Sequence, residues 1–108
     1  MKLLKENQVI LSDVVVATSF TKRLRGYMFY KSPPSEGLVI KPCSSIHTFF
    51  MKFDIDVLFL DDHMMVVKKI EGLKKSQMIP PVKSAIYTIE SSVGKFDDVK
   101  VGDYLTLC

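Results

Sequence analysis

Short runs of β-branched and aromatic residues, separated by turn residues, dominate the hydrophobic pattern of this chain, and such runs are typical of β-strands. The runs at Leu3–Lys5 and Val9–Ala17 flank a polar turn and predict a first hairpin, with a bulge or break at Ser12-Asp13. Ile55–Leu60 is nearly all apolar and predicts a central strand covered on both faces. Further strands are expected at Gly37–Lys41, Ser45–Met51, Met64–Glu71, Ser84–Glu90 and Val99–Leu107.

One segment near the start changes to a helical period. Four apolar side chains fall on one face of a helix, namely Phe20, Leu24, Tyr27 and Met28. Thr18 or Ser19 can cap its start, and Gly26 can take the left-handed conformation that closes a helix. We therefore expect a mainly β, compact barrel- or sandwich-like domain of about seven short strands, with one short helix near residues 19–26.

Composition narrows the class of protein without naming a function. The chain has 108 residues, of which 47% are hydrophobic and 25% charged, which predicts a single globular domain over residues 1–108. The net charge of +3 is too small to indicate a nucleic-acid partner, and no apolar run is long enough to span a bilayer. Two cysteines, Cys43 and Cys108, provide no disulfide framework, so we expect a soluble cytoplasmic protein.

The densest polar cluster in an apolar context extends from Cys43 to Asp56. An extended segment would put Cys43, His47 and Met51 on one face, and these are ligand types for soft metals. Residues four apart on a straight strand are about 13 Å apart, so that strand could not hold one ion, and we expect neither a metal nor another cofactor. Nucleophilic catalysis by Cys43 would need a turn after Pro42 to bring His47 into contact. The structural alternative is a half-buried histidine beside a small buried cysteine.

Several motifs, in this order, resemble one known family. They are Arg23-Leu24-Arg25-Gly26-Tyr27-Met28, Gly37-Leu38-Val39-Ile40, Pro42-Cys43-Ser44-Ser45-Ile46-His47-Thr48-Phe49-Phe50-Met51-Lys52, Ile55-Asp56-Val57-Leu58-Phe59-Leu60-Asp61 and Val101-Gly102-Asp103. The set resembles the bacterial and archaeal family called domain of unknown function 192, in its branch with a Cys-x-x-x-His-Thr segment. The resemblance implies one β-dominated domain with a short early helix and implies no established activity.

The resemblance also selects candidate site residues. The family's motif positions in this sequence are Arg23, Gly26, Met28, His47, Met51, Asp56, Gly102 and Asp103. The two glycines have backbone reasons to be glycine, whereas Arg23, His47 and Asp56 do not. A buried Asp56 needs a cationic or donor partner, which Arg23 or His47 could supply. The three would then form either an internal polar clamp or the floor of a pocket.

These residues support three functional hypotheses. The first is a non-catalytic binding or interaction module with a polar pocket at Arg23, His47 and Asp56. Its partner would be a small anion or a protein, with Arg23 holding the anion and His47 donating a hydrogen bond. The alternatives are a small hydrolase-like enzyme that uses His47 with Cys43 or Asp56, and a metal-binding protein that uses His47, Cys43 and Met51. The sequence leaves the oligomeric state open.

Overall fold

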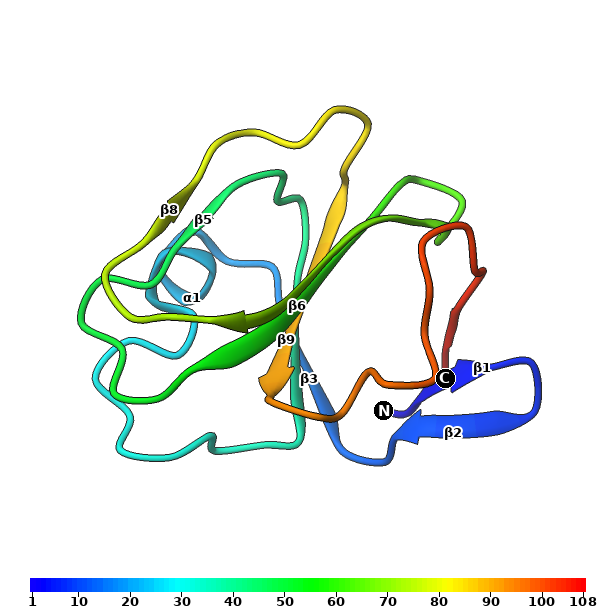
Figure 1. The fold of residues 1–108 in the computed structure, drawn as a ribbon, viewed down its shortest axis with the longest axis horizontal. Coiled ribbons are helices and arrows are strands. Elements are labelled where there is room, and N and C mark those ends of the chain that lie inside the picture. Colours follow the sequence, from blue (N-terminus) through cyan, green and yellow to red (C-terminus); the bar gives the residue numbers. More distant parts are fainter.

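A five-stranded sheet with buried residues on both faces organises the fold (Figure 1). The computed structural model describes residues 1–108, with the side chain of Phe20 outside that description. The strands of this sheet are, in spatial order, β3 (Val14–Ala17), β4 (Gly37–Ile40), β9 (Tyr87–Ser92), β6 (Ile55–Leu60) and β7 (Val66–Leu73). β3 and β4 are parallel, and the other neighbours are antiparallel.

A second sheet brings the two ends of the chain together. It contains β1 (Leu3–Lys5), β2 (Gln8–Leu11) and β10 (Thr106–Leu107), with β1 in the middle. The Lys2 N–H donates to the Cys108 carbonyl at 2.6 Å, and the Cys108 N–H donates back to Lys2 at 3.0 Å. The two termini lie side by side at this end of the molecule (Figure 1).

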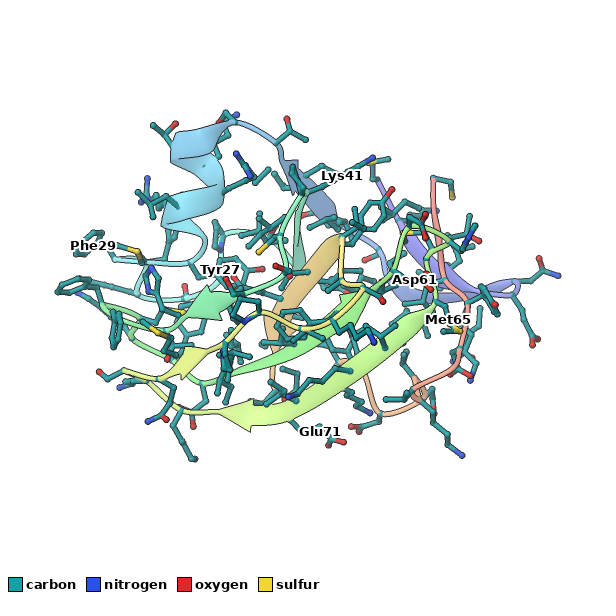
Figure 2. All side chains as sticks on the ribbon, turned by 90° about the horizontal axis from the view of Figure 1, so that it is seen from above. Tyr27, Phe29, Lys41, Asp61, Met65 and Glu71 are labelled. Atoms are coloured by element: carbon teal, nitrogen blue, oxygen red, sulfur yellow. The ribbon has the colours of Figure 1, made fainter. Side chains whose placement is uncertain are left out.

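The opposite end of the molecule carries a short helix and a two-stranded ribbon. The helix, α1 (Phe20–Arg25), is capped by Ser19, whose side chain accepts from the Lys22 N–H at 3.3 Å. It ends at Gly26, which has the positive φ expected at that position, 50°, but a ψ of −125°, so its backbone is not the left-handed helical conformation. β5 (Ile46–His47) pairs antiparallel with β8 (Met78–Ile79) to form the ribbon. Tyr27 lies between the helix and the sheet and is buried (Figure 2).

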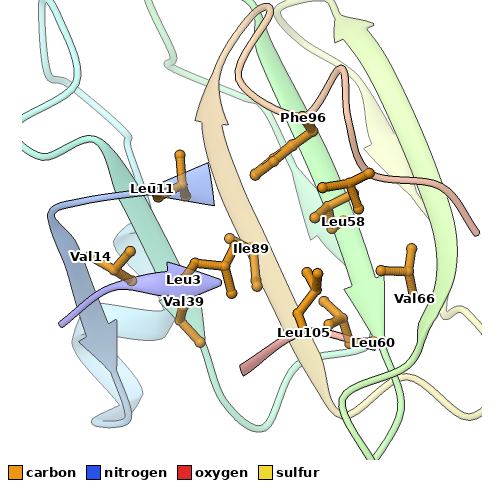
Figure 3. Packing of buried hydrophobic residues seen from close by; sticks show 11 residues of the cluster. Leu3, Leu11, Val14, Val39, Leu58, Leu60, Val66, Ile89, Phe96 and Leu105 are labelled. Carbon is orange, nitrogen blue, oxygen red and sulfur yellow. The ribbon is translucent and has the colours of Figure 1, made fainter. Parts of the chain in front are cut away.

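Strand alternation divides the core into two clusters, one on each face of the five-stranded sheet. Leu58, Leu60 and Ile89 point to the face covered by the second sheet, where they pack with Phe96 and Leu105 (Figure 3). The other apolar residues of β6 point to the face covered by α1 and the β5–β8 ribbon; they are Ile55, Val57 and Phe59. Both faces of β6 are fully buried, which confirms the central strand expected from its apolar run.

The mainly β fold with one short helix is confirmed. The first hairpin and its break at Ser12-Asp13 are also observed, with β3 leaving β2 to join the other sheet. The structure has ten strands, three of them only two residues long, and its sheets do not close into a barrel. Among the described residues no helix is long and apolar enough to cross a membrane.

Two strand boundaries expected from the sequence are wrong. The strand expected at Ser45–Met51 ends after His47, because the chain turns at Phe50, which has a φ of 64°. The strand expected at Val99–Leu107 is reduced to Thr106–Leu107 and a single bridge between Met65 and Tyr104. In the helix, Tyr27 is buried but Leu24 is 57% exposed, and the expectation for the Phe20 side chain lies outside the described part.

Candidate functional site

A cavity of about 310 Å³ lies between α1, the β5–β8 ribbon and the five-stranded sheet. This volume is at the lower end of the range of about 300–1,000 Å³ found for small-molecule sites. Its polar lining comes from Arg23, Arg25, Cys43, Ser45, His47 and Glu90, and its apolar walls include Ile40, Ile46, Met51, Ile79 and Pro80. Two of the predicted site residues, Arg23 and His47, therefore meet in one cavity although they are 24 positions apart.

Arg23 reaches the cavity from the middle of α1. Its Nη1 donates to the Pro42 carbonyl at 3.0 Å, which holds the guanidinium against the loop that leads to β5. Its Nε is buried and has no hydrogen-bond partner within the described residues. A buried N–H without a partner costs free energy, so this atom is an unsatisfied donor in a residue that lines the cavity.

His47 enters the cavity from β5. Its Nδ1 accepts a hydrogen bond from the Phe49 N–H at 3.3 Å, and its ring stacks on the Phe49 ring with centroids 5.2 Å apart. Because Nδ1 is the acceptor, the neutral imidazole carries its proton on Nε2 and presents a donor there. The next residue, Thr48, anchors this segment, since its Oγ1 donates to the Lys74 carbonyl at 2.7 Å and accepts from the Gln77 N–H at 2.8 Å.

Glu90 is the cavity residue that the sequence analysis missed. It lies on β9 and is 2% exposed, and its Oε1 has no partner among the described residues. Burial raises the pKa of this carboxyl from its ordinary value of 4.5 to about 8. The alternation over Ser84–Glu90 places Glu90 on the face opposite Ile89, and Glu90 is buried because both faces of the sheet are covered.

Tyr27 supports the same strand from the helix side. Its hydroxyl donates to the Glu90 carbonyl at 3.3 Å. Burial raises the pKa of the Tyr27 hydroxyl well above its usual value, so the group remains a donor over the whole physiological pH range.

Asp56, the third predicted site residue, lies on the opposite face of the sheet. It pairs with Ser91 across the β6–β9 ladder, whereas its neighbour Val57 pairs with Glu90. Because successive strand residues point to opposite faces, Asp56 cannot share the cavity with Glu90. Its Oδ1 accepts from the Gly72 N–H at 2.7 Å and its Oδ2 from the Gly94 N–H at 2.8 Å. Asp56 is thus a clamp on two backbone amides and lies away from Arg23 and His47.

The geometry needed by the enzymatic and metal hypotheses is incomplete. Cys43 and Met51 do line the cavity with His47, because the chain turns after Pro42. The Cys43 thiol, however, donates to the Ser45 carbonyl at 3.1 Å, and in the described structure no hydrogen bond joins His47 to Cys43 or Asp56. Nor do the described residues contain a group of three His, Cys, Asp or Glu side chains arranged to hold a metal ion.

The sequence has relatives among archaeal proteins. The profile of the DUF192 family, described as an uncharacterized ACR, matches residues 2–107. The UPF0127 protein of Thermococcus kodakarensis is 37% identical over 100 residues, which cover 86% of this chain and 63% of that protein. The UPF0127 protein of Pyrococcus horikoshii is 39% identical over 93 residues, which cover 82% of this chain and 79% of that protein. The chain thus spans less than two thirds of the Thermococcus kodakarensis relative.

Two solved bacterial structures share the fold. A protein of unknown function from Novosphingobium aromaticivorans superposes with a TM-score of 0.76 at 16% identity, covering 87% of this chain and 74% of that chain. A proposed transcription regulator from Sinorhizobium meliloti superposes with a TM-score of 0.75 at 18% identity, covering 86% and 79%. At these identities the likeness establishes the architecture alone.

Replacing the clamp carboxylate should destabilise the fold. In Asp56→Asn the amide offers one acceptor oxygen, so either Gly72 or Gly94 faces an N–H₂ group, and we expect a loss of about 1–3 kcal/mol in the free energy of unfolding. Urea denaturation measures this loss. The matched control is Asp54→Asn, which removes only a surface ion pair with Lys74 and should cost about 0–1 kcal/mol. Equal losses in the two variants would contradict the clamp.

The buried carboxyl of Glu90 should make stability depend on pH. The unfolded chain releases this proton near pH 4.5 and the folded chain near pH 8, so the folded state binds more protons between these values. The contribution of Glu90 to stability is therefore greatest below pH 4.5 and declines as pH rises to about 8. Denaturation curves across this interval should show the decline in the wild type and a flatter profile in Glu90→Gln. The exposed control Glu71→Gln should keep the wild-type slope, and a Glu90→Gln slope equal to it would refute the assignment.

Proposed function

The chain belongs to the DUF192 family, and we propose that it is a non-catalytic binding module whose cavity holds a small anion. The observation that carries this proposal is that two residues lining one cavity each have a buried polar atom without a hydrogen-bond partner, namely Arg23 Nε and Glu90 Oε1. Native folds leave few buried polar atoms without partners, and such atoms call for an explanation such as a bound molecule. One of these atoms is a donor on a permanent cation, and the other belongs to an acid.

Arg23 is the anchor in this proposal. Its Nη1 is already held by the Pro42 carbonyl, so the side chain is oriented before a ligand arrives and less entropy is lost on binding. The free Nε–H is then available for a charge-assisted hydrogen bond to a carboxylate or phosphate oxygen. His47 would add a second donor through Nε2, because its Nδ1 is occupied by Phe49.

Glu90 would act as the selective group. Since its pKa is about 8, the carboxyl is mostly uncharged at neutral pH and does not repel an anion held by Arg23. Its vacant Oε1 can accept a hydrogen bond from an N–H or O–H on the same ligand. The walls of Ile40, Ile46 and Ile79 would receive an apolar remainder. The favoured ligand is therefore a small anion with a neighbouring hydrogen-bond donor and a short apolar part.

We further propose that residues 1–108 act as one domain in a reducing, cytoplasmic setting. Both cysteines are unpaired, with Cys43 half-buried at the cavity and Cys108 exposed. Free thiols of this kind persist where glutathione and thioredoxin keep them reduced.

Titration with two anions tests the proposed site. The probes are inorganic phosphate and isovalerate, a carboxylate with a short branched apolar tail, each followed by nitrogen-15 NMR of the Arg23 Nε–H. We expect a downfield shift of that resonance, and a loss of affinity in Arg23→Gln of about tenfold or more, because a hydrogen bond to a charged group is worth about 1.5–3 kcal/mol.

The matched control for this titration is Lys22→Gln, which removes a positive charge from the same helix but does not line this cavity. It should bind both probes as the wild type does. Unchanged affinity in Arg23→Gln, equal losses in the two variants, or shifts confined to residues outside the cavity would each overturn the proposal.

A further inference from the structure

The end of the molecule that carries the β5–β8 ribbon exposes a continuous set of apolar side chains. We call it the aromatic face; it consists of Leu24, Phe29, Phe49, Phe50 and Met78, with exposures of 37–67%. Contacts connect several of them: Phe29 stacks on Phe50 with centroids 5.4 Å apart, Phe49 stacks on His47, and His47 pairs with Met78 across the ribbon. Leu24 and Met78 both line the rim of the cavity. Phe29 lies at the end of the molecule away from Asp61 and Met65 (Figure 2).

The backbone at this face is strained. Phe29 has a φ of 69° and Phe50 a φ of 64°, a left-handed conformation that bulky side chains rarely adopt. A hydrogen bond from the Phe29 N–H to the Phe50 carbonyl, at 3.0 Å, ties the two strained turns together. Neither ring gains burial in return, since the two side chains are 59% and 65% exposed. The two rings gain only their mutual stacking, and strain retained at side chains that stay exposed points to a function for them.

Exposed cations lie close in sequence to the phenylalanines of this face. Residues 19–53 contain six Lys and Arg side chains and one carboxylate, Glu36, whereas the whole chain has a net charge of only +3. Lys31 and Lys52 each follow a face phenylalanine by two positions and are exposed. The Arg25 guanidinium lies 4.2 Å from the centroid of the Tyr30 ring, and Tyr30 directly follows Phe29 in the sequence. Lys75, which precedes β8, is also exposed, whereas its neighbour Lys74 is paired with Asp54 at 3.0 Å.

We infer that the aromatic face docks on an anionic lipid surface, with Phe29 and Phe50 inserted among the acyl chains and the surrounding cations against the headgroups. Apolar side chains at strained loop tips enter the interface, and basic residues near them add attraction to acidic lipids. This is a surface contact of the whole folded chain and involves no spanning segment. It does not depend on the ligand proposed for the cavity.

Two other occupants fit the face less well. A second copy related by a twofold axis would bring the same cations against one another, which opposes association. A single-stranded nucleic acid would stack its bases on open aromatic faces, whereas Phe29 and Phe50 each cover one face of the other ring. Leu24 and Met78 add apolar surface, which suits the acyl chains of a lipid and offers no hydrogen bond to a nucleic-acid base.

Vesicle sedimentation tests the inference. The full chain is mixed with phosphatidylcholine vesicles and with vesicles in which one quarter of the lipid is phosphatidylglycerol. We expect binding to the anionic vesicles that weakens with added salt. The double variant Phe29→Asn with Phe50→Asn should lose at least about tenfold in partitioning, since two apolar anchors are removed.

Thermal unfolding of the same variant separates docking from folding. Asparagine tolerates positive φ, so the double variant should be no less stable than the wild type although it no longer binds vesicles. The matched control is Tyr104→Asn, an aromatic side chain that is 62% exposed and pairs with Met65 at the other end of the molecule. This control should bind vesicles as the wild type does.

Four results would overturn the inference. The first two are equal binding to neutral and anionic vesicles, and vesicle binding by the double variant that equals that of the wild type. The third is a dimer in sedimentation velocity that the double variant does not form. The fourth is a wild-type chain that does not bind vesicles but binds a labelled single-stranded oligonucleotide through Phe29 and Phe50. A drop in vesicle binding by Tyr104→Asn equal to that of the double variant would likewise contradict it.

Discussion

The pairing of β9 with β6 is the constraint on which the rest of this structure depends. All residues of β6 and the four central residues of β9 are buried. Each of their side chains must therefore fit between packed neighbours on one face of the sheet or the other. Their register sends Leu58 and Ile89 to the face sealed by the terminal strands, and Val57 and Glu90 to the face covered by α1. A shift of one residue would exchange the two sets, so the same ladder fixes both cores and the cavity.

Local patterns predicted much of the fold because the relevant forces are local. The unbroken apolar run at Ile55–Leu60 indicated a strand covered on both faces, and Ser19 with Gly26 marked the ends of α1, since capping is decided within one turn. The prediction failed at Ser45–Met51, where Phe50 takes a conformation that its own preference opposes and only tertiary contacts can impose. β10 was overestimated for a related reason, because its partner β1 lies at the other end of the chain.

The candidate site was predicted in part. Arg23 and His47 were singled out from the family resemblance, as motif positions without a backbone reason for the residue type, and both line the cavity. Asp56 was expected beside them, but the acid that lines the cavity is Glu90, for which the sequence analysis made no prediction. Both are buried acids, but Asp56 is satisfied by the amides of Gly72 and Gly94, whereas Glu90 has an oxygen without a partner. Which acid faces the cavity follows from strand parity across β6 and β9, and parity depends on a register that no single segment of sequence contains.

His47 belongs to the wall of the cavity and to the underside of the aromatic face at once. Its ring lines the cavity and also supports Phe49, and its strand partner is the exposed Met78. A molecule that moved this ring on entering the cavity would change the surface that Phe49 presents, and contact at the surface would change the cavity by the same route. Thermodynamic linkage makes such an effect equal in both directions. Ligand binding in the cavity would then change the affinity of the surface contact, and the surface contact would change the affinity of the cavity, through the His47 ring.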